Sequence, residues 1–246
     1  RLNPDGSLDG TFNPGFGADG DINSVSVQAD DRVVIGGRFL LFDGVQVPGV
    51  ARLQLDGSLD RSFAEALPRV DIASSWVNRV EVLEDGRILV AGSFAATHDA
   101  DGNVLTYRGV LRLKRDGSVD TTFQPDAAIA LADREYGPNG DIRALGIQPD
   151  GSIIVGGTFT QFHGKTHNRV VRLTLDGELD TTINFGSGAD GAILDAVVQN
   201  DFRIILAGQF EEFDGELRLR LARVYGGFNY DDGTIRFAET SFVVNE

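Results

Sequence analysis

One repeated motif restricts the fold of this chain more than any other feature. The sequence RLNPDGSLDGTF begins at Arg1, and related versions begin at Arg52, Arg112 and Arg172, with a shortened RVYGGF at Arg223. These starting points lie 51 to 60 residues apart. A second phrase occurs four times, as VVIGGRFLLFDG, ILVAGSFAATHDADG, IIVGGTFTQFHG and IILAGQFEEFDG. Regular units of this length predict a repeat protein, in which each unit buries an apolar face against its neighbour.

Each unit has the pattern of β-strands. In VNRVEVLEDGRILVAGSF, residues 80–82 alternate between apolar and polar, a turn is expected at Asp85-Gly86, and the apolar run 88–90 follows. Glycine accepts the positive φ that tight hairpin turns require. A run that is apolar on both sides predicts a strand covered on both faces. The equivalent turns are expected at Asp30-Asp31, Asp150-Gly151 and Asn200-Asp201.

A third strand is expected from the segments GVARLQL, GVLRLKR, RVVRLTL and RLRLARV, of which the first three end at a further Asp-Gly turn. The tail SLDRSF is expected to add a short fourth strand or an outer turn. No segment has a sustained helical period, and AAIALADREYG is the nearest candidate helix.

Three to four antiparallel strands per unit predict an all-β fold, a β-propeller built from antiparallel three- to four-stranded blades. A solenoid is the competing architecture, but its units are typically shorter. The phenylalanine after each second strand is expected to fill the space between adjacent blades; these are Phe39, Phe94, Phe159 and Phe210. Four complete repeats are expected near residues 21–63, 72–123, 140–183 and 192–225, within a propeller domain over 1–225.

The sequence is compatible with both a closed ring and an open arc of blades, because five copies of the third strand accompany the four repeats. The surplus copy either latches the first blade to the last or belongs to a preceding blade. An open arc would leave sheet edges and apolar blade faces exposed.

The two recurring phrases, such as RLKRDGSVDTTF and DGRILVAGSF, resemble the delta-sixty repeat, a bacterial family of propeller-like repeats. The resemblance covers roughly residues 1–225. It implies a β-propeller in a long, exported, often multidomain protein, at an extracellular or cell-surface location, and it implies no activity or site residues. Residues 226–246 are expected to form a linker and a first strand, since GTIRFAETSFVVNE resembles the start of a Calx-beta domain, a calcium-associated module.

The charge balance excludes some classes of partner. The chain has 22 basic and 37 acidic residues, a net charge of −15, and no cysteine. Such a surface repels nucleic-acid phosphates and anionic lipid headgroups, so we expect neither nucleic acid nor membrane insertion. Without cysteine, disulfides, thiolate metal sites and cysteine catalysis are excluded.

A calcium site is the most suggestive cation hypothesis. HDADGN places Asp99, Asp101 and Asn103 at alternate positions around Gly102, as at the start of an oxygen-ligand calcium loop. The glutamate and the helices of an EF-hand are missing, so an acidic turn on an inserted loop is the alternative interpretation. Asp19 and Asp190 form a second candidate pair for a shared metal or polar ligand, with turn chemistry as the alternative.

Arginines interrupt apolar strands at one position in each repeat. A buried arginine requires a partner, and an aspartate follows eight residues later in most copies. We therefore predict structural ion pairs that stabilise the blade corner: Arg52 with Asp60, Arg112 with Asp120, Arg172 with Asp180, and Arg1 with Asp9. Arg223 occupies the same position in the last copy.

The remaining candidates favour structural roles. His163 and His167 have the spacing of a zinc pair on a helix, but they lie in a segment expected to be loop and strand, which favours a surface pair; His98 lies in the inserted loop. Trp76 and Tyr107 could stack on sugars, although core packing is the preferred interpretation.

The sequence thus favours a non-enzymatic binding or adhesion scaffold with no catalytic or cofactor residues. A protein or glycan partner is expected at the loops of the second and third repeats, where the insertions lie. The alternatives are a glycan-active propeller enzyme and calcium-dependent assembly through Asp99, Asp101 and Asn103.

Overall fold

The computed structural model describes residues 1–70, 75–98, 101–102, 104–123 and 137–227. The chain divides into two compact units, Arg1–Asp120 and Thr121–Glu246. Each unit contains two of the four repeats, and each repeat forms its own small antiparallel sheet. Among the described residues, no helix has the length and apolar character to cross a membrane.

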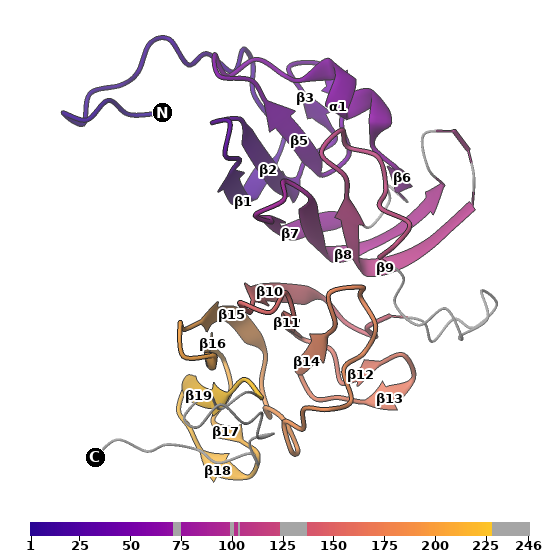
Figure 1. Ribbon diagram of the computed structural model, residues 1–246. Coiled ribbons are helices and arrows are strands. Elements are labelled where there is room, and N and C mark those ends of the chain that lie inside the picture. The colour runs from indigo at the N-terminus through magenta and orange to yellow at the C-terminus, as the bar shows by residue number, and fades with distance from the viewer. Residues whose placement is uncertain (71–74, 99–100, 103, 124–136, 228–246) are drawn as a thin grey trace. The chain divides into compact units, whose positions relative to one another are not determined.

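The first unit contains two sheets that pack against each other (Figure 1). The first repeat has the strand order β1-β2-β5, and in the second repeat β8 pairs with β6, β7 and β9. The elements are β1 (Asp21–Val27), β2 (Val33–Arg38), β3 (Leu41–Phe42), β4 (Val45–Gln46), β5 (Val50–Leu53), α1 (Arg61–Ala66), β6 (Arg69–Val70), β7 (Trp76–Val82), β8 (Ile88–His98) and β9 (Val104–Leu113).

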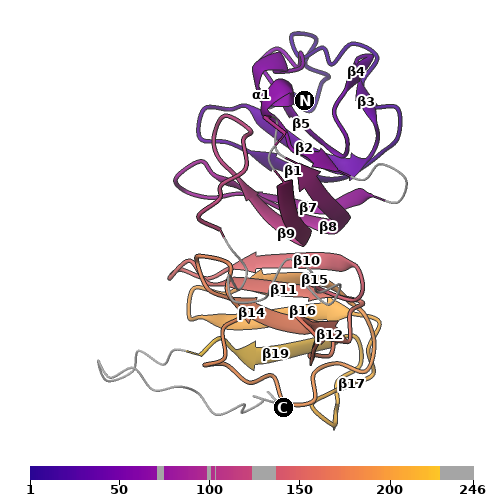
Figure 2. The same cartoon turned by 90° about the vertical axis from the view of Figure 1, so that its right-hand side faces the viewer.

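The second unit repeats this plan. Its sheets have the orders β10-β11-β14 and β15-β16-β19, and Figure 2 shows them as stacked layers. The elements are β10 (Ile142–Ile147), β11 (Ile153–Gly157), β12 (Gln161–Phe162), β13 (Lys165–Thr166), β14 (Val170–Leu173), β15 (Ile193–Val198), β16 (Arg203–Gly208), β17 (Glu212–Phe213), β18 (Glu216–Leu217) and β19 (Leu221–Tyr225). The predicted all-β fold with antiparallel three- to four-stranded blades is confirmed.

The hairpin turns between the first two strands of the repeats share one geometry. The fourth turn residue has a positive φ, of 63° at Asp31, 82° at Gly86 and 85° at Gly151, at the predicted positions. In the fourth repeat this residue is Phe202, with φ 65°, because the Phe202 N–H donates to the Gln199 carbonyl. The prediction of Asn200-Asp201 is therefore one residue too early. A bulky residue at positive φ is strained.

Glycines in the second strands let consecutive repeats approach closely. A Cβ atom on Gly36 would lie 2.7 Å from Val77 Cγ1 and 2.8 Å from Val80 Cγ1. A Cβ atom on Gly156 would lie 2.6 Å from Ile193 Cγ2. The three branched side chains are buried. In each unit, the second strand of one repeat therefore covers the first strand of the next.

The predicted phenylalanines belong to the core. All four are buried, and Phe210 is part of a cluster that includes Val170 and Ile154 of the third repeat and Ile193 of the fourth. It also meets the ring of Phe213 edge-on at a centroid distance of 6.3 Å. This burial between sheets agrees with the expected role between blades.

A two-residue hairpin, which the strand pattern does not predict, follows the second strand in three repeats. At its tip both residues have positive φ, 47° at Asp43 and 75° at Gly44, and the other two copies are His163-Gly164 and Asp214-Gly215. Such φ values are those of a type I′ turn, which favours Asn-Gly and Asp-Gly pairs. The recurring FDG and FHG triplets are the sequence signal for this hairpin.

The tail SLDRSF differs from expectation in the first repeat. Residues after Asp60 form the short helix α1, because the Asp60 carboxylate caps it by accepting from the Phe63 N–H. The fourth strand occurs in the second repeat, where β6 pairs with the extended end of β8. The candidate helix AAIALADREYG lies mostly outside the described residues, as does nearly all of the segment 226–246.

Candidate functional site

The predicted arginine–aspartate pairs form within the repeats. Arg52 Nη2 lies 2.8 Å from Asp60 Oδ2, and Arg112 Nε lies 2.7 Å from Asp120 Oδ2. In the second unit Arg172 Nη2 lies 2.7 Å from Asp180 Oδ2. The three arginines are buried. Their role as structural ion pairs follows from this burial, because a buried charge requires a hydrogen-bonded partner.

The same arginines also connect consecutive repeats, which the spacing of eight residues does not reveal. Arg1 Nη1 donates to the Leu55 carbonyl at 3.2 Å, and Arg52 Nη1 donates to the Arg115 carbonyl. Leu55 and Arg115 occupy the same position, three residues after the arginine of their own repeat. The guanidinium groups of Arg1 and Arg52 thus each bond a carboxylate in their own repeat and a backbone carbonyl in the next one.

The carboxylates of these pairs are held in the ionised form. Burial by itself would raise the pKa of Asp60, but hydrogen bonds from Ser62 and Arg52 outweigh it, so that the pKa lies below its usual value. Asp180 has the same balance of burial against bonds from Thr182 and Arg172, and its pKa is also lowered. At the half-buried Asp9, hydrogen bonds from Thr11 and Arg1 lower the pKa to about 2.

The side chains of Asp19 and Asp190 stabilise turns. Asp19 Oδ1 accepts from the Leu40 and Leu41 N–H groups at 2.8 and 2.9 Å. Asp190 Oδ1 binds two backbone N–H groups in the same way, at 2.9 and 3.0 Å, and these bonds lower the pKa of both aspartates. Asn139 occupies the equivalent place in the third repeat, and its Oδ1 accepts from two backbone N–H groups. Turn chemistry therefore explains these residues.

The predicted surface pair of histidines is wrong for His163. This side chain is buried, and its Nδ1 accepts from the Gly137 N–H at 3.0 Å. In the first repeat the equivalent residue, Asp43, accepts from the Phe16 N–H. Histidine here replaces a turn aspartate. Burial and the nearby Lys165 lower the pKa of His167, which is half-buried.

The calcium hypothesis lies largely outside the described residues, because Asp99 and Asn103 are not among them. Asp101 is exposed. In the part of the chain that the structure describes, no group of three or more histidine or acidic side chains could hold a metal ion.

An apolar pocket in the first unit is the strongest candidate binding site. Its walls come from both repeats: Phe39, Leu40, Pro48, Gly49 and Val50 from the first, Val77, Val90, Phe94, Leu111 and Leu113 from the second, and Leu67, Pro68, Ser75 and Trp76 from the connection between them and the start of β7. The cavity volume is about 30 Å³. It therefore accepts the tip of one side chain, whereas pockets for small-molecule ligands have volumes of about 300–1,000 Å³.

Trp76 at this pocket is half-buried, and the Arg38 guanidinium lies over its ring, 5.4 Å from the centroid. Leu40 on the other side is 42% exposed. Tyr107, by contrast, is buried, and this burial raises the pKa of its hydroxyl. Core packing is thus confirmed for Tyr107, whereas Trp76 keeps part of its surface open to solvent.

A second hollow lies in the second unit, with a volume of about 170 Å³ and polar walls that include His167, Asn168, Asp180 and Asn184. Two of its amide side chains already have partners. Asn168 donates to the Ser187 carbonyl, and Asn184 accepts from the Gly186 N–H. Ile183 lines the hollow at the position that Phe63 and Phe123 occupy in the first two repeats. The smaller side chain accounts for the space.

Solved structures with a similar arrangement of strands include enzymes. A gluconolactonase from Xanthomonas campestris is 19% identical, with 83% of this chain and 59% of that chain covered and a TM-score of 0.47. A second protein assigned as a gluconolactonase is 16% identical, with coverages of 83% and 61% and a TM-score of 0.47. A streptogramin B lyase is 13% identical, with coverages of 85% and 52% and a TM-score of 0.45.

The prediction that this chain is not an enzyme is wrong as stated, because the structures that resemble it include gluconolactonases. One fold can have many functions, so the function of this chain must be argued from a site. The chain spans between 52% and 61% of the length of these three structures.

No curated protein matches the sequence. A family model does match it, in three segments that each begin in or near a first hairpin turn and end just after the Asp-Gly turn of the third strand. The strand order and the turns of these segments agree with blades. The chain is an all-β protein whose first three repeats, at residues 28–63, 83–123 and 148–182, match the beta-propeller family described as a domain of unknown function, DUF5122.

Proposed function

We propose that this chain is a binding module that holds a protein partner through the pocket beside Trp76. The observation that carries the proposal is the half-buried tryptophan at an apolar pocket whose floor, from Phe39, Phe94 and Leu111, is buried. Tryptophan and arginine are the residue types most enriched at binding hot spots, where they surround a pocket for an apolar anchor. The second repeat, one of the two at whose loops a partner is expected, supplies part of the pocket wall.

The size and charge of the site favour a protein over a small ligand. A pocket of about 30 Å³ takes the end of one leucine, isoleucine or aromatic side chain. The exposed Leu40 and Leu41 extend the apolar surface beside it. The net charge of −15 raises the association rate of a basic partner, and this effect weakens as salt screens the field. The expected partner is therefore a basic protein segment with one protruding apolar side chain.

The pocket contains its own reporter, because Trp76 is the only tryptophan in the sequence. We would select binders from a library of random peptides and titrate them while recording tryptophan fluorescence. Selected peptides should share an apolar anchor and basic residues, shift the Trp76 emission to the blue, and bind about tenfold or more weakly to a Leu40→Glu variant.

The control is Leu219→Glu, which changes a 63% exposed leucine in the second unit. This variant should bind the selected peptides as the parent does. Equal affinity for the Leu40→Glu and parent proteins would overturn the site. Binding on a glycan array that is lost with Trp76→Ala, with no peptide selected, would assign the pocket to sugars instead.

A further inference from the structure

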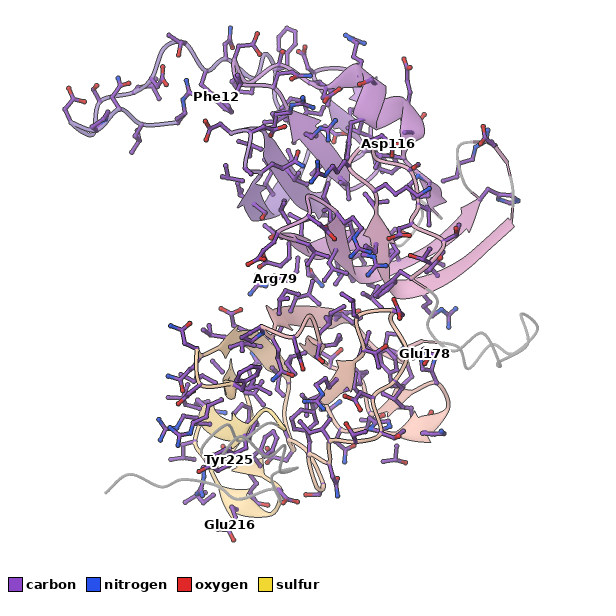
Figure 3. All side chains as sticks on the ribbon, viewed as in Figure 1. Phe12, Arg79, Asp116, Glu178, Glu216 and Tyr225 are labelled. Carbon is purple, nitrogen blue, oxygen red and sulfur yellow. The ribbon has the colours of Figure 1, made fainter. Side chains whose placement is uncertain are left out.

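An arginine lies at the rim of the pocket beside Trp76. Arg38 is exposed at the end of β2, and the next residue, Phe39, forms part of the pocket wall. The Arg38 guanidinium lies over the ring of Trp76, the first residue of β7; Arg79 of the same strand is labelled in Figure 3. In the part of the chain that the structure describes, no ion pair or side-chain hydrogen bond uses this guanidinium. A cation that no described carboxylate neutralises is therefore placed beside an apolar pocket.

The carboxylate best placed to pair with Arg38 does not do so. Asp21 lies directly opposite Arg38 in the register of β1 and β2, and opposite charges at such positions commonly attract each other. The guanidinium instead contacts the Trp76 ring of the next repeat, 5.4 Å from the centroid. This contact is electrostatic and uses no hydrogen bond, so the N–H donors of Arg38 can bind an anionic group of a ligand.

The fold itself does not require this pair of side chains. The position of Arg38 is occupied by Ser93, Thr158 and Gln209 in the other three repeats, and that of Trp76 by Asp21, Asp141 and Ala192. At the equivalent junction in the second unit, Thr158 and Ala192 provide neither a cation nor a ring, yet the strands pair in the same way. The combination of Arg38 and Trp76 therefore points to binding and not to the architecture of the blades.

The chemistry of the rim and of the pocket together specifies the ligand. The pocket accepts an apolar side-chain tip, since its volume is about 30 Å³ and its walls are mostly apolar. Arginine binds carboxylates through two parallel hydrogen bonds, which are stronger than bonds between neutral groups. Because Arg38 directly precedes a wall residue, the ligand requires its carboxylate close to its apolar side chain. The last residue of a polypeptide carries both groups on one Cα atom.

We propose that the pocket binds the C-terminal residue of its partner, with the apolar side chain in the pocket and the terminal carboxylate bound by Arg38. This inference rests on the proposed function, because it specifies which part of the protein partner enters the site. Capture of a terminal carboxylate is one of the recurring modes of peptide recognition. The basic residues of the partner precede the anchor in its sequence, since the chain ends at the pocket.

The test uses a synthetic lysine-rich peptide that ends in leucine. It is prepared as the free acid, as the C-terminal amide, and with one glycine added after the leucine, which moves the carboxylate away from the anchor. Calorimetry gives the dissociation constants, and Trp76 fluorescence reports whether the pocket is occupied. The free acid should bind about fivefold or more tightly than either of the other two peptides.

Arg38→Gln is the matching variant. Gln209 occupies the equivalent position in the fourth repeat, so the variant should fold, and an unchanged melting temperature verifies this. It should bind the free acid and the amide with equal affinity. Arg61→Gln is the control, because Arg61 is exposed in the same unit and is not part of the pocket wall. This control should keep the preference of the parent protein for the free acid.

The outcomes separate this inference from the function on which it rests. Equal binding of the free acid and the amide would overturn the inference, although the peptide would still occupy the pocket. A preference for the free acid that Arg38→Gln retains would also overturn it. If none of the three peptides binds but library-selected peptides do, the anchor is not C-terminal; if those fail as well, the proposed function is wrong. Binding of dodecanoate that depends on Arg38, without peptide binding, would assign the site to small carboxylates.

Discussion

The junction between the first two repeats and the junction between the last two share one backbone geometry but differ in chemistry. In the first unit, Ser24 Oγ accepts from the Val80 N–H at 3.1 Å, and Ser26 Oγ accepts from the Val82 N–H at 3.2 Å. These hydroxyls accept hydrogen bonds from backbone N–H groups at the edge of β7, and these N–H groups would otherwise lack an acceptor. In the second unit the equivalent residues are Ala144 and Gly146, and a Cβ on Gly146 would lie only 3.1 Å from Val198 Cγ2.

The same contrast occurs at the arginine corners. The Arg52 guanidinium lies over the Phe63 ring, 4.3 Å from its centroid. Asp60 also forms an ion pair with Arg32, whose Nη1 lies 3.4 Å from Asp60 Oδ2. In the second unit, Ile183 replaces the ring and Ser152 replaces the second arginine. The turns and ion pairs thus define the blade, while the side chains that fill the junction can change. This difference predicts unequal responses to equivalent mutations.

The largest difference should appear when the arginine is removed. Arg172→Leu leaves the half-buried Asp180 carboxylate without its cation, and we expect a loss of about 3–5 kcal/mol in the free energy of unfolding. Arg52→Leu should lower the free energy of unfolding less, because Asp60 keeps its ion pair with Arg32. Guanidinium unfolding of both variants measures the difference. Equal losses, or a loss below about 1 kcal/mol for Arg172→Leu, would contradict the proposed importance of the second arginine.

Acid should reveal the same pairs. The pKa values of Asp60 and Asp180 are lowered in the folded state, so these carboxylates stabilise the folded protein fully above the unfolded-state pKa of about 3.9. This stabilisation is lost as the pH falls through the lower folded-state pKa. We expect unfolding free energy to decrease with decreasing pH in this window. Asp180→Asn should be less stable at neutral pH and should show a shallower decrease. An unchanged slope would mean that Asp180 does not contribute.

Exchanging the residues at the equivalent positions 63 and 183 tests how much an aromatic ring beside the arginine stabilises each unit. Phe63→Ile should destabilise the first unit by about 1–2 kcal/mol, through lost packing and lost contact with Arg52. Ile183→Phe should fill part of the hollow beside Arg172 and stabilise the second unit by up to about 1 kcal/mol. Thermal unfolding measures both. A destabilised Ile183→Phe would show that the backbone around the hollow cannot accept the ring.

The smallest effect should come from the serines of β1. Ser24→Ala and Ser26→Ala should each cost about 0.5–1.5 kcal/mol, since each leaves a β7 amide without its acceptor. Hydrogen exchange in β7 should become faster, while β15 should not change. Ser58→Ala, in an exposed turn, is the control and should leave β7 exchange at the parent rate. Unaltered exchange in both serine variants would mean that water replaces the hydroxyls at no cost.

Local signals in the sequence predicted much of this molecule. The hairpin turns at Gly86 and Gly151 depend on residues a few positions apart, as does the partnership of Arg52 with Asp60. The prediction at Phe202 was displaced by one residue, because nothing in its side chain marks a left-handed position. His163 was placed at the surface because its role as a turn acceptor depends on Gly137, far away in the sequence.

The binding hypothesis was only partly accessible. The sequence indicated the loops of the second and third repeats as the place for a partner. The pocket beside Trp76 is instead formed by Phe39 and Leu40 of the first repeat and Phe94 and Leu111 of the second. No short-range pattern brings these residues together. The calcium hypothesis and the extracellular location stay predictions.

The sequence by itself determined the single repeat: its strands, its turns and its internal ion pair, because each follows from residues that are neighbours in the chain. Only the tertiary structure decided how consecutive repeats within a unit pack together. The bond from Arg52 to the Arg115 carbonyl spans 63 residues, and the exposure of Val25 against the burial of Val80 depends on which repeat lies beside each strand. Identical local patterns can be covered or open, because burial is a property of the neighbour and not of the residue.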